Sequence, residues 1–213
     1  MIIPRHVLGG PGAPSNRLRM GSIGVGRMGR GDMEAAMGGA LIVAVCDTDV
    51  TRARSAGSLV AKRQGAGNPA TVYQDYRELL DVELDGVVVA SPHTLHYEHG
   101  RAVLERGLPL MCEKPMTTQA AHARELVELA QARGAIVCPG NWSTHVLGAA
   151  TVHLAAWSPI TPFIESAPGE VYGSPLRKAL QSIGLPVVEG AIALPTAPGI
   201  GIDLPAELIA EFL

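Results

Sequence analysis

The sequence predicts an α/β fold: a doubly wound parallel sheet followed by an irregular, proline-rich C-terminal appendage. Up to residue 138, short apolar runs recur that do not alternate with polar residues, which is typical of strands buried on both faces. Helix-compatible segments separate these runs, as in a parallel sheet with helices on both sides. Beyond residue 139, eight prolines between Pro159 and Pro205 stand too close together for further strand–helix–strand units.

The expected strands are apolar runs that end in a turn residue, an acid or a cysteine. Because all of them are expected to be parallel, their carboxyl ends should share one edge of the sheet, where ligands of such folds bind. The predicted strands lie at 18–24, 41–47, 85–91, 108–112 and 135–138.

The expected helices carry apolar residues at a spacing of three and four, or begin and end at residues that favour helix termini. In the first part of the chain they cover 30–38, 51–63, 76–80, 97–106 and a helix that Thr117 or Thr118 caps and Gly134 ends. In the second part, an apolar helix is expected over 145–157. Another is expected from Ser174, the predicted N-cap before Pro175, to Gly184.

A Gly-x-Gly-x-x-Gly turn, residues 24–29, joins the first expected strand to the first helix. Gly24 permits the tight turn, Gly26 lets the backbone approach a pyrophosphate, and Gly29 lets the helix pack close to the strand. The helix start then offers free N–H groups to the phosphates. Asp47 follows Gly24 by 23 residues, close to the spacing of an acid that bonds the ribose hydroxyls. The pattern predicts a Rossmann-like, dinucleotide-binding domain.

Composition and charge exclude several classes of protein. The net charge of −3 gives no reason to expect nucleic acid or an anionic membrane as a partner. No stretch approaches the roughly 20 apolar residues that span a bilayer. The three cysteines lack ligand-like spacing and suit a reducing compartment, so a cytoplasmic location is expected. We expect a flexible tail at 1–16, the dinucleotide-binding domain at 17–138 and a separate C-terminal segment at 139–213.

Four motifs in order resemble the Gfo/Idh/MocA family of nicotinamide-dependent oxidoreductases over roughly residues 17–138. The resemblance implies NAD as cofactor, a fold of Rossmann type and, for an active member, hydride transfer on a sugar or polyol-type alcohol. The family's usual third motif is Thr-Pro-Asn-x-x-His after a strand, so Ser91 and His93 are mild departures. The motifs are Gly24 to Gly29, Val45-Cys46-Asp47, Asp85 to His96 and Cys112-Glu113-Lys114-Pro115.

By this resemblance Lys114 is the candidate catalytic residue, because a cation beside the hydride-transfer centre stabilises negative charge on a substrate oxygen. Asp47 favours NAD over NADP, since a 2′-phosphate would meet a like charge. Arg52 and Arg54 weaken that preference, so NADP stays open. His96 is also expected to bond backbone at the strand–helix turn. The implied cofactor-binding residues are Gly24, Gly26, Arg27, Met28, Gly29, Asp47, Ser91, Pro92, His93, His96 and Glu113.

From about residue 136 the chain resembles the C-terminal end of the mandelate racemase branch of the enolase superfamily. Residues 139–145, 152–156, 163–165 and 195–202 carry this resemblance. The chain therefore looks like a fusion of two fragments that cross near Ala135. The carboxylates that bind magnesium in that superfamily come from barrel strands without a counterpart here, and no metal site is expected. In particular, His93, His96 and His99 have no Cys or carboxylate partner at fixed spacing.

Three functions remain open at this level. The first is an NAD(P)-dependent oxidoreductase of Gfo/Idh/MocA type. The second is a catalytically inactive dinucleotide-binding module that acts through association, because the second domain of the family is not recognisable after residue 138. The third and least favoured is an acid-sugar dehydratase of enolase type. Self-association into a homo-oligomer, through the apolar residues of the C-terminal part, is also left open.

Overall fold

The computed structural model describes residues 17–65, 67–141, 144–166 and 174–211. The tail expected at 1–16 lies outside the described residues. Contacts between Cα atoms divide the chain between Arg133 and Gly134 into two compact units, and each unit is described by itself.

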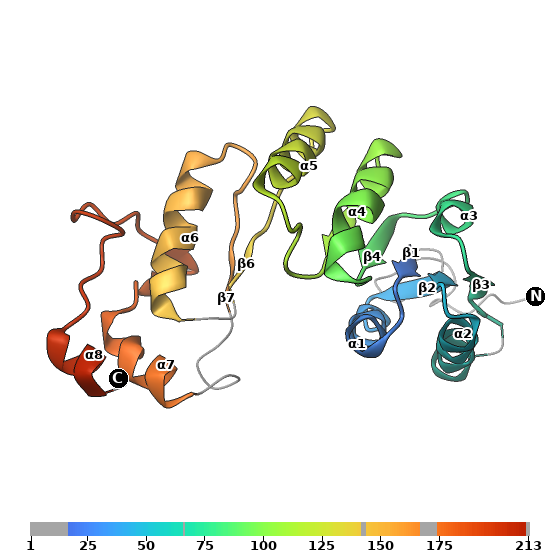
Figure 1. Ribbon diagram of the computed structural model, residues 1–213, viewed down its shortest axis with the longest axis horizontal. Coiled ribbons are helices and arrows are strands. Elements are labelled where there is room, and N and C mark those ends of the chain that lie inside the picture. Colours follow the sequence, from blue (N-terminus) through green and yellow to red (C-terminus); the bar gives the residue numbers. More distant parts are fainter. Residues whose placement is uncertain (1–16, 66, 142–143, 167–173, 212–213) are drawn as a thin grey trace, which may run out of the picture. The chain divides into compact units, whose positions relative to one another are not determined.

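The first unit is built on five parallel strands in the order β3-β2-β1-β4-β5 (Figure 1). The chain starts in the middle of the sheet, moves to one edge through β2 and β3, and then returns to the other side of β1 for β4 and β5. This confirms the predicted doubly wound, Rossmann-like sheet. The strands are β1 (Leu18–Ile23), β2 (Ala40–Cys46), β3 (Thr71–Tyr73), β4 (Gly86–Val89) and β5 (Leu110–Cys112).

Helices cover both faces of this sheet and bury two separate apolar cores. One core joins β2 to α1 and α2 through Met33, Ile42, Val45 and Val60. The other core lies on the opposite face and includes residues of α3 and α4. The helices of the unit are α1 (Arg27–Ala36), α2 (Val50–Gln64), α3 (Tyr76–Leu80), α4 (His96–Glu105) and α5 (Ala120–Ala132), with a 3₁₀ turn, η3 (His93–Leu95), before α4.

Four details differ from the sequence-based expectations. Strand β3 was not predicted, because a three-residue edge strand has too few residues to show a pattern. Helix α1 begins three residues earlier than expected, directly after Gly26. The N-cap of α5 is Gln119 rather than Thr117 or Thr118; the Thr117 hydroxyl donates to the Gln119 carbonyl over 2.7 Å. The segment 135–138 forms no strand and stands outside the five-stranded sheet.

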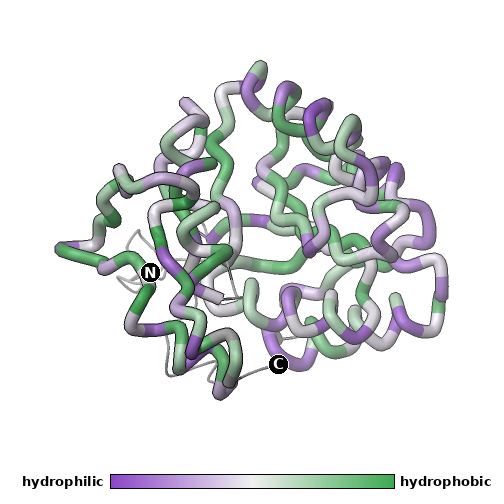
Figure 2. Tube along the Cα trace, turned by 60° about the vertical axis from the view of Figure 1, so that its left-hand side comes forward, coloured by the Kyte–Doolittle hydropathy of each residue, from purple (hydrophilic) through white to green (hydrophobic). Residues whose placement is uncertain are grey.

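The second unit consists of short elements and one longer helix that is largely apolar. Figure 2 shows hydrophobic residues in green along the Cα trace. The helix predicted over 145–157 is confirmed, as is Ser174 as an N-cap: its hydroxyl accepts the Arg177 N–H over 3.2 Å. The elements are α6 (His145–Trp157), α7 (Pro175–Ala179), the 3₁₀ turn η4 (Leu180–Ile183), α8 (Ala206–Glu211), the pair β6 (Gly140–Asn141) and β7 (Glu165–Ser166), and the pair β8 (Val187–Val188) and β9 (Ala191–Ile192).

Among the helices of the described ranges, none is long and apolar enough to cross a membrane.

Candidate dinucleotide-binding site

The candidate site lies at the carboxyl ends of β1 and β4, where the order of the strands reverses. Ligands of open α/β sheets bind at such a switch point. Backbone hydrogen bonds hold the loops after the strands in register: Gly24 donates to the Cys46 carbonyl over 2.8 Å, and Glu113 donates to the Val89 carbonyl over 2.8 Å. The loops after β1, β2, β4 and β5, which the sequence motifs mark, therefore share one edge of the sheet.

The first and third glycines of the loop after β1 are required by close packing. Gly24 has a φ of +80°, and a Cβ there would lie 2.5 Å from the backbone nitrogen of Ser91. A Cβ on Gly29 would overlap the carbonyl oxygen of Gly24. The roles predicted for these two residues, a tight turn and a close approach of helix to strand, agree with this geometry.

Gly26 differs from its two neighbours, because a Cβ on it would meet no atom of the described residues within 4 Å. Its Cα faces open space at the start of α1, so packing within the protein does not explain a glycine here. The approach of a ligand such as a pyrophosphate does explain it. Met28, with 57% of its surface exposed, and Arg27 stand in the first turn beside this opening.

The N-terminus of α1 carries no side-chain cap. Gly26 is the N-cap, and the first hydrogen bond of the helix runs from the Arg30 N–H to the Gly26 carbonyl over 2.9 Å. By contrast, the Asp49 carboxylate caps α2 by accepting the N–H groups of Thr51 and Arg52. An uncapped N-terminus leaves its first N–H groups and the positive end of the helix dipole for an anion. The residues present therefore fit the pyrophosphate of a dinucleotide.

Asp47 follows β2 and contacts the glycine loop directly. Its Oδ2 accepts the Val25 N–H over 3.1 Å, and its Oδ1 accepts the Asp49 N–H over 3.0 Å. Each carboxylate oxygen retains a lone pair for a further donor, such as a ribose hydroxyl. Arg52, expected to weaken the preference for NAD, lies 3.5 Å from the Asp49 carboxylate, which offsets part of its charge.

Two histidines of α4 hold the loop that follows β4. Buried His96 places Nε2 2.7 Å from the Ser91 carbonyl oxygen and Nδ1 2.7 Å from the Pro115 carbonyl oxygen, as expected of a residue that bonds backbone. His99 places Nδ1 2.9 Å from the Ser91 hydroxyl, and burial lowers the pKa of His99. Pro92 and His93 are exposed at the start of η3. The Ser91 turn is thus fixed from one side by Gly24 and from the other by histidines.

The loop after β5 brings Glu113 and Lys114 to the same edge. The Glu113 carboxylate accepts the backbone N–H of Lys114 over 3.0 Å, and the Lys114 side chain is exposed.

One residue of this region was not predicted from the sequence: Asp32 of α1 has a buried Oδ2 without a partner among the described residues. Burial, reinforced by the nearby negative charge of Glu113, raises the pKa of Asp32. The signal in the sequence that could have found Asp32 was its position beside Met33, on the buried side of a helix.

The model of the family described as "Oxidoreductase family, NAD-binding Rossmann fold" matches residues 18–141, more than half of the chain. The chain belongs to the Gfo/Idh/MocA family. The resemblance stated from the motifs is confirmed, and the first unit is an NAD-binding Rossmann fold. A second model, "Enolase C-terminal domain-like", matches residues 117–208 and confirms the resemblance of the C-terminal segment. The two matches overlap at 117–141, so α5 lies within both.

Several Gfo/Idh/MocA relatives are sugar or polyol dehydrogenases. "Inositol 2-dehydrogenase 1" of Saccharopolyspora erythraea is 35% identical over 121 residues, 55% of this chain and 34% of that protein. "Rhizopine catabolism protein MocA" of Rhizobium meliloti is 30% identical over 131 residues, 61% of this chain and 39% of that protein. The chain thus spans a little over a third of the length of these relatives.

A solved structure shares the fold of the first unit. It is myo-inositol dehydrogenase from Lactobacillus casei in complex with NAD(H) and myo-inositol, at 29% sequence identity and a TM-score of 0.51. The similarity covers 57% of this chain and 35% of that one.

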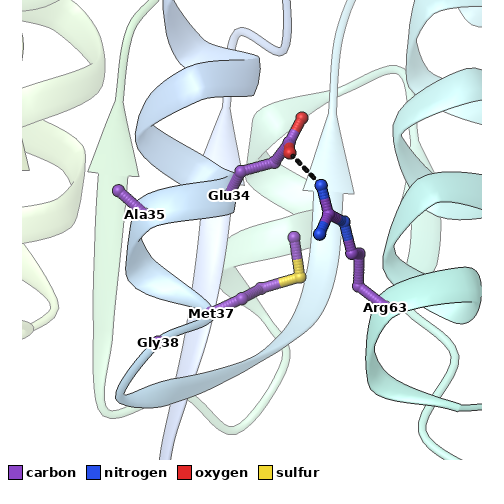
Figure 3. A pocket seen from close by; sticks show the side chains of 5 residues that line it. All are labelled: Glu34, Ala35, Met37, Gly38 and Arg63. Atoms are coloured by element: carbon purple, nitrogen blue, oxygen red, sulfur yellow. Dashed lines mark hydrogen bonds and ion pairs between the residues drawn. The ribbon is translucent and has the colours of Figure 1, made fainter.

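A pocket of about 480 Å³ lies at the opposite end of α1 from the glycine loop, and Figure 3 shows the side chains that line it. Its lining includes Glu34, Met37 and Arg63, and the Arg63 guanidinium donates to the Glu34 carboxylate over 3.1 Å. The pocket lies at the C-terminal, negative end of α1, which disfavours a phosphate. It is separate from the candidate NAD site. Within the described ranges, no group of three or more His, Cys, Asp or Glu side chains could hold a metal ion.

The three thiols are expected to differ in reactivity. Burial raises the pKa of Cys46 to about 12 and that of Cys112 to about 11, with Asp47 and Glu113 adding to the respective shifts. Little thiolate then forms near neutral pH, whereas Cys138 is exposed. We expect iodoacetamide to label Cys138 first in the native protein, as followed by peptide mass spectrometry. Equally fast labelling of Cys46 would contradict the buried environment; full labelling in denaturant is the control.

Proposed function

We propose that the first unit binds NAD across the ends of β1 and β4, and that the site transfers hydride between NAD and an alcohol of a sugar or polyol. The observation that carries this proposal is the meeting of four loops at one sheet edge. These loops supply an uncapped helix N-terminus, the acid Asp47, the Ser91 turn and the exposed Lys114. The printed names of the relatives supply the substrate class.

Each loop has a distinct task in this proposal. The first turn of α1, residues 27–29, holds the pyrophosphate, and Asp47 binds the adenosine ribose. The Ser91–Pro92 turn and Glu113 border the nicotinamide half. Bound NAD would supply the hydride acceptor for the alcohol carbon. The Lys114 ammonium would stabilise the negative charge that develops on the substrate oxygen as the hydroxyl proton passes to solvent water. Asp47 makes NAD the preferred cofactor, and NADP the weaker one.

The alternative is an inactive dinucleotide-binding module that acts through association. It predicts the same affinity for NADH and no turnover. Exposed apolar residues of the second unit, such as Trp157, Phe163 and Val188, favour a homo-oligomer in either case. The free cysteines, among them exposed Cys138, suit the cytoplasm, where thiols stay reduced.

Replacing Lys114 by alanine separates the enzyme from the module. We expect an NADH affinity within about twofold of the wild type and a kcat on polyols that falls roughly 100-fold, the usual cost of one charge-stabilising group. The measurement is NADH formation with a panel of inositols, sugars and polyols. Lys62→Ala, which removes an exposed lysine at the far end of α2, is the matched control.

Turnover that Lys114→Ala leaves unchanged would remove Lys114 from the reaction. Wild-type protein that binds NADH but turns over no member of the panel would instead support the inactive module.

A further inference from the structure

His96 has an unusual pair of partners. Both of its ring nitrogens lie 2.7 Å from backbone carbonyl oxygens, those of Ser91 and Pro115. The side chain is 1% exposed, so water cannot replace either partner. A carbonyl oxygen only accepts hydrogen bonds, whereas a neutral imidazole donates from one nitrogen and accepts at the other. A neutral ring would therefore point a lone pair at one of the two oxygens.

We propose that His96 is a doubly protonated positioning residue that holds the loop after β4 and the loop after β5 together for the bound cofactor. Only the imidazolium donates from both nitrogens. A distance of 2.7 Å lies at the short end of the N–H···O range, where charge-assisted hydrogen bonds are found. Two such bonds offset part of the cost of burying the charge.

The neighbouring His99 fits this arrangement as the neutral member of the pair. Its Nδ1 lies 2.9 Å from the Ser91 hydroxyl, which can donate to a neutral ring. Burial, together with the adjacent charge of His96, lowers the pKa of His99. Ser91 thus receives a hydrogen bond at its carbonyl from one histidine and donates one from its hydroxyl to the other.

The two carbonyl groups that His96 joins belong to the candidate site. Ser91 packs against Gly24 of the glycine loop, and Pro115 follows Glu113 and Lys114 directly. His96 therefore connects the turn that touches the glycine loop to the segment that carries the proposed catalytic lysine. Loss of one of its protons would release one of these two carbonyls and loosen Lys114 relative to the glycine loop.

The charged and titratable groups around His96 come from four elements. His93 of η3 has its ring centroid 5.5 Å from that of His96. On α4 and α3, His99 lies beside Glu98, Arg77 and Tyr76. In the loop after β5, Glu113 and Lys114 precede Pro115. No described carboxylate is hydrogen-bonded to the His96 ring, so the two carbonyl groups are the features that favour the second proton.

The inference rests on the proposed NAD site, and its first test does not need that site to work. In protein labelled with ¹⁵N at histidine, both ring nitrogens of His96 should show the chemical shifts of protonated nitrogens at neutral pH, and those of His99 the shifts of a neutral ring. His96→Gln identifies the resonances. A neutral His96 ring at neutral pH would overturn the proposal.

The second test measures NADH affinity. We expect His96→Gln to bind NADH roughly tenfold to a hundredfold more weakly than the wild type. His122→Gln, which changes a histidine that stacks on Tyr97 and is not among the residues assigned to the site, should behave as wild type. Equal affinity of His96→Gln and wild type would overturn the positioning role. Absence of NADH binding in the wild type, with a doubly protonated His96, would refute the proposed function instead.

Discussion

Replacing Gly29 by alanine is expected to destabilise the first unit severely and to abolish NADH binding. The added Cβ would overlap the carbonyl oxygen of Gly24, which is backbone and cannot rotate away. Relief requires α1 to move off β1 and to open the glycine loop. Overpacking of this kind costs on the order of 1–3 kcal/mol or more, a large part of a domain's stability. Urea unfolding followed by circular dichroism measures the loss.

Two other glycines of the same short stretch serve as controls. Gly31→Ala adds a Cβ that meets no described atom within 4 Å, on an interior position of α1. It should raise stability by about 0.5–1 kcal/mol, because alanine favours helix more than glycine does, and leave NADH affinity unchanged.

Gly26→Ala should leave stability near that of the wild type but weaken NADH binding, because the Cβ enters the space of the pyrophosphate. Wild-type affinity in Gly26→Ala would contradict the assigned phosphate position.

Replacing Asp47 by asparagine is expected to change the choice of cofactor. The charged acceptor for the ribose hydroxyls is lost, which costs about 1.5–3 kcal/mol of NADH binding, or roughly tenfold or more in affinity. NADPH should bind more tightly than before, because its 2′-phosphate no longer meets a negative charge. Asparagine can still accept the Val25 N–H that Asp47 accepts, so the loop is expected to keep its shape.

Titration of both reduced cofactors by fluorescence measures this change. Asp49→Asn is the matched control: asparagine caps helices about as well as aspartate, and the same charge is removed two residues away. If the preference between NADH and NADPH changes equally in Asp49→Asn, the loss of one negative charge in this region, and not the loss of Asp47 itself, causes the effect. An unchanged preference in Asp47→Asn would exclude Asp47 from the ribose site.

The strands and helices of the first unit could be predicted wherever the residues that determine them lie close together in the sequence. The apolar runs of β2 and β4 and the glycine turn between β1 and α1 are readable over a few residues. Strand β3 was not, because its existence depends on pairing with β2, where Thr71 lies opposite Ala44. The apolar segment 135–138 suggested a strand, yet the Val137 N–H bonds the Ile160 carbonyl over 2.6 Å, within the second unit.

The candidate site likewise has some features that the local sequence predicts and others that depend on the folded structure. Gly24, Gly29 and the end positions of the strands follow from motif spacing. The double contact of His96 does not, because its partners Ser91 and Pro115 lie five residues before it and 19 residues after it, and they meet only in the folded sheet. Asp32 was missed for a related reason. Its proximity to Glu113 brings α1 together with the loop after β5, which no local pattern records.

We propose that this chain holds an NAD site at the ends of β1 and β4. Titration of the wild-type protein with NADH, followed by cofactor fluorescence and calorimetry, tests it most directly. We expect saturable binding of one NADH per chain that Gly26→Ala weakens and Gly31→Ala does not. No binding at millimolar NADH by folded protein would contradict it.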